Sequence, residues 1–288
     1  METLVLYCKS YKNDVLRAKA LAESIRKFNT DHIPFYISVP AADMGLFTEQ
    51  LKGLDCTLLR DEEILATNPR HSMDLMHEMR GGLLQQVVKS EFWRLGISRN
   101  YVMIDSDSYF IRPFSLEDFM FDGETPYTVM HEGRDLLDFA ARTGKRKIRN
   151  NFAKDRLQAK ENFKRPGRIY DFGPTPLICS SLVWKRLAEE YAEPANKSLA
   201  DLIREFPNEM LWYGEAVLHY APICLMPIEP LFKVYHYKEQ YQESLEIGEN
   251  EETIAENYLG IIKQSNWDFS LDLVPKKKRT WKSLWMKR

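Results

Sequence analysis

Two aspartates separated by one serine follow a hydrophobic run in NYVMIDSDSYFI, residues 100–111. Asp105 and Asp107 would face the same side of a regular strand, because strand residues two apart point the same way. Two adjacent carboxylates repel each other, so a cation is expected between them. Mn²⁺ or Mg²⁺ suits such a pair, because both ions prefer oxygen ligands together with water and phosphate. The motif therefore predicts a metal and phosphate site, although D-x-D also occurs in turns and helix caps.

Strand and helix patterns alternate ahead of the aspartates. Short apolar runs predict strands and amphipathic periodicity predicts helices. The strands are expected at 3–8, 34–40, 56–60 and 101–107, and the helices at 13–28, 42–53 and 81–97. This alternation predicts an α/β fold with a mostly parallel sheet flanked by helices. Ligands of such sheets bind beyond the carboxyl ends of the strands, which is where the aspartates are expected.

Composition indicates an ordinary globular protein. The 288 residues are 44% hydrophobic and 28% charged, enough for one large core with an elaboration. The four cysteines form no C-x-x-C pair, which argues against a zinc ribbon or a disulfide framework. The N-terminus does not resemble a signal peptide, and no apolar run reaches the ~20 residues of a membrane-spanning helix. We therefore expect a cytoplasmic protein, with any membrane contact peripheral.

Charge is distributed unevenly although the net charge is only −2. Residues 142–168 contain eleven Lys or Arg against two acids, residues 239–256 contain seven Glu and no base, and residues 276–288 contain seven bases. The basic segment 142–168 is expected to be a helical insertion near the acceptor, and 276–288 a peripheral contact with an anionic membrane. Either segment could equally be a solvated surface. Few aromatic residues interrupt the insertion, which argues against nucleic acid as a partner.

Four motifs resemble one enzyme class. YVMIDSDSYFIRPF resembles the DxD region of the GT-A class of nucleotide-sugar glycosyltransferases. GGLLQQVVKSEF, FGPTPLICSSLVWKRL and NEMLWYGEAVL are similar to motifs of a bacterial GT-A-like group found in surface-polysaccharide gene contexts. The resemblance spans most of residues 3–240. It implies a GT-A, Rossmann-like fold with a nucleotide-sugar half at 1–112 and an acceptor half at 113–240. A helical, basic extension would follow at 241–288.

The resemblance also implies a reaction. A divalent cation, Mn²⁺ or Mg²⁺, would bind the phosphate groups of a UDP-, GDP- or CMP-linked donor, bridging the diphosphate where there is one, and a glycan or lipid-linked hydroxyl would accept the sugar. Its expected metal ligands are Asp105, Asp107 and His236. Asp107 is the expected direct ligand, while Asp105 would contact the ribose or metal-bound water. The alternative for His236 is a partly buried structural histidine.

Further polar residues are expected to contact the donor. Lys89 would meet a phosphate or pair with an aspartate, and the nearby glutamines would bind hydroxyls, unless the helix presents only a solvated polar stripe. By analogy, the end of the first strand would contact the base. The complete set of expected donor contacts is Tyr7, Lys9, Ser10, Gln85, Gln86, Lys89, Asp105 and Ser106.

An inverting transferase also needs a general base. Glu209 is preferred for this role because it fits the Glu-x-x-x-Tyr-Gly pattern, and Glu215 and Asp171 are the alternatives.

Two other functions remain open. A nucleotidyltransferase could use the same aspartates, although no Gly-rich loop follows the first strand. A binding protein on a degenerate scaffold is the other alternative.

Overall fold

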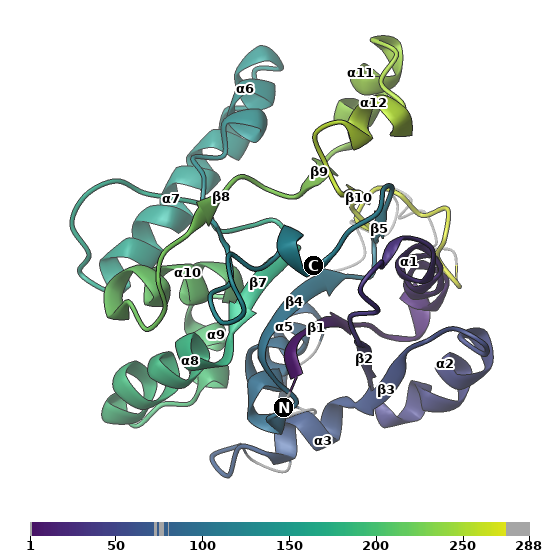
Figure 1. Cartoon of the computed structure of the whole chain (residues 1–288). Helices are drawn as coiled ribbons and strands as arrows, with labels where there is room; N and C mark the ends of the chain where they lie inside the picture. Colours follow the sequence, from purple (N-terminus) through teal and green to yellow (C-terminus); the bar gives the residue numbers. More distant parts are fainter. Residues whose placement is uncertain (1, 72–73, 75–77, 80, 275–288) are drawn as a thin grey trace, which may run out of the picture.

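A five-stranded sheet lies at the centre of the protein (Figure 1). The computed structural model describes residues 2–71, 74, 78–79 and 81–274, so the predicted membrane contact at 276–288 lies outside the described residues. The strand order is β3-β2-β1-β4-β7. The bounds are β1 (Glu2–Lys9), β2 (Phe35–Val39), β3 (Thr57–Arg60), β4 (Ser98–Asp105) and β7 (Leu177–Ser180). All neighbours pair in parallel except β7, which runs antiparallel to β4. The predicted α/β class is therefore confirmed.

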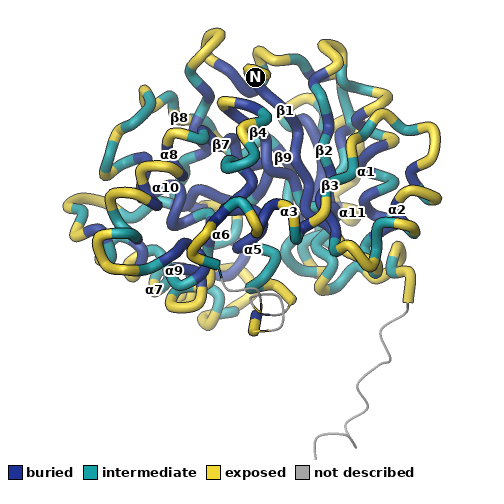
Figure 2. Tube along the Cα trace, turned by 90° about the horizontal axis from the view of Figure 1, so that it is seen from below, coloured by how far each residue is buried: buried dark blue, intermediate teal, exposed yellow. Residues whose placement is uncertain are grey.

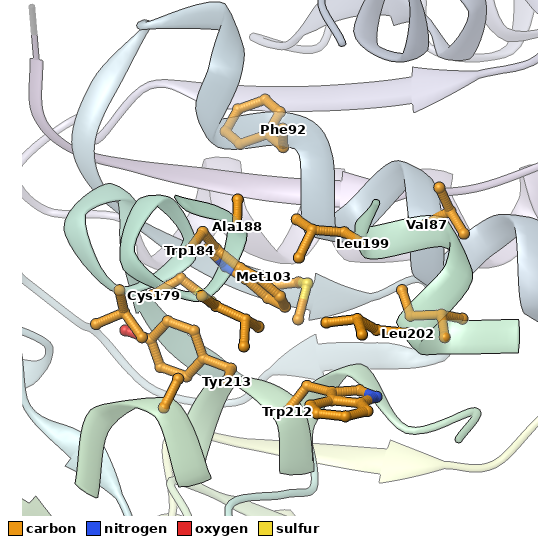
Figure 3. Packing of buried hydrophobic residues seen from close by; sticks show 14 of the residues in the cluster. Val87, Phe92, Met103, Cys179, Trp184, Ala188, Leu199, Leu202, Trp212 and Tyr213 are labelled. Atoms are coloured by element: carbon orange, nitrogen blue, oxygen red, sulfur yellow. The ribbon is translucent and has the colours of Figure 1, made fainter. Parts of the chain in front are cut away.

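Helices cover both faces of this sheet. One face packs against α1 (Val15–Phe28) and α2 (Met44–Gln50). The other packs against α3 (Asp61–Ala66), α5 (Gly82–Glu91), α8 (Ser181–Arg186), α9 (Leu199–Glu205) and α10 (Glu209–Tyr220). Burial on both faces explains the continuous apolar run of β4. Figure 2 shows the strands as the buried centre of the protein. Figure 3 shows part of the hydrophobic core on the second face, with Met103 of β4 and Trp184 of α8.

Two smaller sheets and four further helices extend this core. A three-stranded sheet has the order β5-β10-β9, formed by β5 (Ser108–Phe110), β10 (Gly260–Lys263) and β9 (Phe232–Tyr235). β6 (Thr128–Val129) pairs with β8 (Pro227–Ile228). The helices are α6 (Arg134–Arg142), α7 (Arg146–Asn162), α11 (Lys238–Glu246) and α12 (Glu251–Ala255). α6 and the α11–α12 pair extend from the same end of the molecule (Figure 1).

The end of β4 differs from the sequence prediction. The strand stops at Asp105, and Ser106 and Asp107 form a turn into β5. The expectation that both aspartates lie on one regular strand is therefore wrong. The reason is that β5 leaves the central sheet and pairs with β10 instead. The helix predicted at 81–97 likewise ends early, at Glu91, and continues as a 3₁₀ turn up to Leu95.

The segment beyond residue 240 contributes to the second sheet. β10 lies between β5 and β9, so this part of the chain is joined to the strand that follows the aspartates. Within the described ranges, no helix combines the length and the apolar character that crossing a bilayer requires.

Gly214 allows α10 to approach the loop that carries Phe172. A Cβ at Gly214 would lie 1.9 Å from the Phe172 ring, whereas a Cβ at Gly45 in α2 would meet nothing within 4 Å. We expect Gly214→Ala to lower the free energy of unfolding by about 1–3 kcal/mol or more through overpacking. Gly45→Ala is the matched control, and it should leave stability unchanged or raise it by up to about 1 kcal/mol. Denaturant unfolding measures both, and equal stability of the two variants would contradict the packing.

Candidate active site at the carboxyl end of β4

The buried ammonium of Lys89 connects three elements. Its Nζ donates to Asp105 Oδ1 at 2.5 Å, at the end of β4, and to Glu209 Oε1 at 3.3 Å, at the start of α10. Burial alone would lower the pKa of Lys89, but the charges of Asp105 and Glu209 outweigh it and raise that pKa. Lys89 is therefore a fixed positive charge between two acids.

Asp105 is held on both carboxylate oxygens. Oδ1 accepts from Lys89, and Oδ2 accepts a hydrogen bond from Thr175 Oγ1 at 3.1 Å. Thr175 lies in the Gly-Pro-Thr-Pro segment, 173–176, in which both X-Pro peptide bonds are cis. The Asp105 side chain is 30% exposed. Its geometry is thus fixed while part of the carboxylate is open to a ligand.

Asp107 is anchored by the last residue of β10 and by a residue that follows it. Its Oδ2 accepts from the backbone N–H of Ser265 at 2.8 Å, and its main-chain oxygen accepts from Lys263 N–H at 3.2 Å. Burial and then the charge of Asp105 raise the pKa of Asp107 to about 6, against the opposing hydrogen bond from Ser265. The two carboxylates therefore influence each other although they do not share a strand.

The paired carboxylates fit a hard divalent cation. Mg²⁺ and Mn²⁺ bind one or two carboxylates and take the remaining ligands from water and phosphate. A cation would also relieve the repulsion that raises the pKa of Asp107. Among the described residues, no group of three or more His, Cys, Asp or Glu is arranged to hold a metal. Asp105 and Asp107 are therefore the two carboxylates that would hold a cation here.

The end of β1 provides a second polar group. Lys9 is buried and its Nζ lies 2.9 Å from Asp61 Oδ2, at the start of α3. Ser10 Oγ is buried and has no hydrogen-bond partner within the described ranges. The Tyr7 ring is fully buried, stacks on Phe92 at 3.8 Å, and its hydroxyl bonds to Ser38. Of the three residues predicted at this strand end, only Ser10 thus has a polar atom left unpaired.

The other expected donor contacts are Gln85 and Gln86 of α5 and Ser106, which follows β4. Gln86 Oε1 is buried and has no hydrogen-bond partner in the described part of the chain, whereas Gln85 is half-buried. Ser106 is 7% exposed and lies in the turn between the two aspartates. The buried, unpaired oxygen of Gln86 has capacity for a further hydrogen bond.

Glu215 lies in a separate ion pair. Its carboxylate is fully buried and accepts two hydrogen bonds from Arg165, from Nε at 2.6 Å and from Nη2 at 3.0 Å. Arg165 belongs to the basic insertion. Glu215 is therefore neutralised by its own partner, whereas Glu209 shares Lys89 with Asp105.

A cleft of about 630 Å³ is lined by Asp171, His236, His131, Pro174 and Tyr258. Pro174 precedes Thr175, the residue that holds Asp105, so the cleft wall and the aspartate site share one segment. Asp171 Oδ1 lies 2.7 Å from Arg156 Nη2 and also accepts the Phe172 N–H at 3.0 Å. The carboxylate of Asp171 is therefore paired, and it borders the cleft.

Two histidines face this cleft. His131 Nδ1 accepts from Gly133 N–H at 3.0 Å, and its Nε2 donates to the carbonyl oxygen of Gly173, which is the pattern of a neutral ring. Burial lowers the pKa of His236 to about 4. No hydrogen bond or ion pair among the described residues joins His236 to Asp105 or Asp107. His236 is neutral at ordinary pH, as a ligand must be, and its role as one stays a prediction.

Opposite charges meet at the rim of the cleft. Arg142 at the end of α6 lies 3.3 Å from Glu243 of α11, and Lys145 lies 3.0 Å from Glu239. The basic insertion and the acidic run 239–256 thus contact each other. Part of the charge asymmetry in the sequence is neutralised within the protein.

Sequence reasoning missed several residues of the site. They all act through contacts between distant segments, and they are Asp61, His131, Arg156, Arg165, Thr175 and Ser265. Only Thr175 lies in a motif that the sequence analysis had singled out. For Ser265 no local signal exists, because its contribution is a backbone N–H.

A family model described as a family of unknown function, DUF6492, matches residues 3–257. A search of curated proteins found no match. The match to the family model covers the five strands of the central sheet, the cleft lining up to residue 257 and the segments that carry Asp105, Asp107 and Glu209.

Solved structures resemble the chain at low sequence identity. The apo WbbM bifunctional glycosyltransferase matches with a TM-score of 0.52 and 13% identity, over 93% of this chain but only 46% of its own. Mouse xyloside xylosyltransferase 1, also in its apo form, matches with a TM-score of 0.47 and 8% identity, over 92% of this chain and 99% of its own. The galactosyltransferase LgtC in complex with donor and acceptor sugar analogs matches with a TM-score of 0.48 and 11% identity, over 89% of this chain and 86% of its own. The similarity to WbbM concerns the fold, and it agrees with the predicted GT-A-type architecture.

The raised pKa of Asp107 predicts how stability depends on pH. A folded-state pKa near 6, above the usual value of 3.8, means that the folded protein binds this proton more tightly than the unfolded chain. Stability should therefore fall as pH rises from about 4 to 6, by roughly 1–3 kcal/mol from this group. Asp107→Asn should remove that part of the slope in denaturant unfolding at pH 4.5 and 7.5. Asp138→Asn, at an exposed position on α6, should keep the wild-type slope; parallel slopes for Asp107→Asn and wild type would contradict the assignment.

Proposed function

The chain belongs to DUF6492, a family of unknown function, and we propose that it is a metal-dependent glycosyltransferase that uses a nucleotide-sugar donor. The observation that carries the proposal is the placement of two carboxylates, Asp105 and Asp107, at the carboxyl end of the central strand β4 and in the turn that follows it. Parallel α/β sheets bind ligands at this edge. The WbbM structure, which shares this fold, bears the name of a glycosyltransferase.

Asp105 and Asp107 would hold the metal and, through it, the donor. When bound there, Mn²⁺ or Mg²⁺ would stabilise the negative charge that develops on the phosphate of the departing nucleotide. Lys89 keeps Asp105 in place through a hydrogen bond between charged groups that the burial of the ammonium strengthens. Ser10 Oγ and Gln86 Oε1 have unused hydrogen-bonding capacity for the nucleotide or sugar hydroxyls. UDP, GDP and CMP are the candidate nucleotides.

Glu209 is the proposed general base. Lys89 bonds both Glu209 and Asp105, so the Glu209 carboxylate lies one ammonium group away from the aspartate site. It would accept the proton of the attacking acceptor hydroxyl, a contribution of roughly 10²–10⁴-fold in rate. Asp171 is bonded to Arg156 on the cleft wall, a position that suits orientation of the acceptor.

The cleft beside Asp171 is the proposed acceptor site. Its volume of about 630 Å³ lies in the usual range for ligand pockets and would admit the terminal sugars of a glycan or a lipid-linked acceptor. We further propose a cytoplasmic site of action in surface-polysaccharide synthesis, in line with the motif resemblance.

Donor binding can be tested without knowing the acceptor. Thermal-shift measurements with UDP, GDP, CMP and their sugars, with and without Mn²⁺, should show one nucleotide that stabilises the protein only in the presence of the metal. At a hundred times the dissociation constant the gain is about 2.7 kcal/mol. Asp107→Asn should abolish this gain, and Asp138→Asn should keep it. Indifference to every nucleotide at millimolar concentration would refute the donor assignment.

The same assay decides the role of His236. If His236 completes the metal site, His236→Ala should weaken the Mn²⁺-dependent gain. If the gain is the same as in wild type, His236 is a structural residue of the cleft.

The base is tested by separating binding from turnover. Glu209→Gln should retain metal-dependent donor binding but lower the rate of nucleoside diphosphate release, in transfer or in slow donor hydrolysis, by roughly 10²–10⁴-fold. Glu161→Gln, on the exposed side of α7, is the control and should retain full activity. A rate for Glu209→Gln within a factor of a few of wild type would exclude Glu209 as the base.

A further inference from the structure

A second groove, of about 530 Å³, lies on the other side of α7 from the cleft. Phe152 of α7 lines the cleft, whereas Gln158 and Asn162 of the same helix line the groove. The opposite wall is formed by Tyr191 and by the segment 205–208 that precedes α10. No residue that we place in donor binding or catalysis lines this groove.

Aromatic rings form the apolar part of the groove. Trp212 is 3% exposed, is labelled in Figure 3, and lies 5.4 Å from Tyr191 and 6.0 Å from Phe206 between ring centroids. The Trp212 Nε1–H donates to the Phe206 carbonyl oxygen at 2.9 Å, and the Tyr191 hydroxyl donates to the Asn162 carbonyl oxygen at 3.1 Å. The rings are thus held in place, and Tyr191 and Phe206 remain half-buried. Such rings can pack against apolar C–H faces of a ligand.

Amides and carboxylates form the polar part. Gln158 Nε2 donates to Asn162 Oδ1 at 3.1 Å, which leaves the Gln158 oxygen and the Asn162 NH₂ group with unused capacity. Asp155 and Glu205 add acceptors, and Glu205 is bonded to Lys197 at 2.8 Å. Side-chain amides both donate and accept, so they match hydroxyl groups, which do the same.

The charge of the groove disfavours an anionic ligand. Its charged lining residues are the base Lys154 and the acids Asp155 and Glu205, so acids outnumber bases. Phosphate or nucleic acid would require an excess of Lys or Arg. A ligand with hydroxyl groups, apolar C–H faces and no charge is a neutral sugar. We propose that this groove is a second carbohydrate site, which binds a neutral saccharide of about two residues.

The position of the groove suggests what the site does. Phe206 and Asn208 line it, and Asn208 caps α10 by accepting the Leu211 N–H at 3.0 Å. The next residue is Glu209, the proposed base. A glycan held here would raise the local concentration of acceptor chains beside the cleft. This role as an accessory acceptor site rests on the proposed function, whereas saccharide binding itself does not.

The test is an NMR titration of the full chain with maltose, cellobiose, lactose and N,N′-diacetylchitobiose, without nucleotide or metal. We expect millimolar binding of at least one disaccharide, weakened at least tenfold in the double variant Gln158→Ala/Asn162→Ala. The matched control is Asn150→Ala/Asn151→Ala, which removes two exposed amides from the same helix outside both cavities and should bind as wild type does.

Asp107→Asn separates this inference from the proposed reaction. It should still bind the disaccharide, whether or not the protein is a transferase. The inference is overturned if none of the four sugars binds, or if Gln158→Ala/Asn162→Ala binds them as tightly as the control does. Binding that is lost in Asp107→Asn would place the sugar at the site of Asp105 and Asp107 and would likewise overturn it.

Discussion

The ion pairs of one buried ammonium group hold the site together. Lys89 of α5 bonds Asp105 of β4 and Glu209 of α10, which lie 16 and 120 residues from it in the chain. A buried charge without partners is costly, so each of the three groups needs the other two. The relative placement of a strand end and two helices therefore depends on this contact. The aspartate pair, the cleft wall through Thr175 and the start of α10 all connect to it.

Much of the fold was predictable because its signals are local. The apolar run of β4 and the amphipathic helices before it are properties of short segments, and the structure confirms them. The turn at Ser106 and Asp107 was not predictable, since it exists because β5 pairs with β10 from the far end of the chain. His131 and Arg156 escaped notice for the same reason. Their partners, Gly173 and Asp171, are neighbours only in the folded protein.

The charged runs of the sequence had two interpretations, a solvated surface or a site for a partner. The structure adds a third, in which some of these charges pair with opposite charges of the same protein. Arg156 and Arg165 of the basic insertion pair with the acids Asp171 and Glu215 inside the protein. At the rim, exposed pairs such as Lys145 with Glu239 join the insertion to the acidic segment. Exposed pairs of this kind contribute little stability each, but they bring two charged segments together with a preferred orientation. Part of the charge of the basic insertion is thus neutralised by acids of the same protein.

The anchoring of Asp107 has a consequence for biosynthesis. The backbone N–H that holds its carboxylate belongs to Ser265, 158 residues later. During translation, the strands and helices of the first hundred residues emerge well before this partner. A nascent chain can therefore form the parallel part of the sheet early, while the turn that bears the aspartate waits for β10. The contact that completes the site is thus among the last to become possible as the ribosome extends the chain.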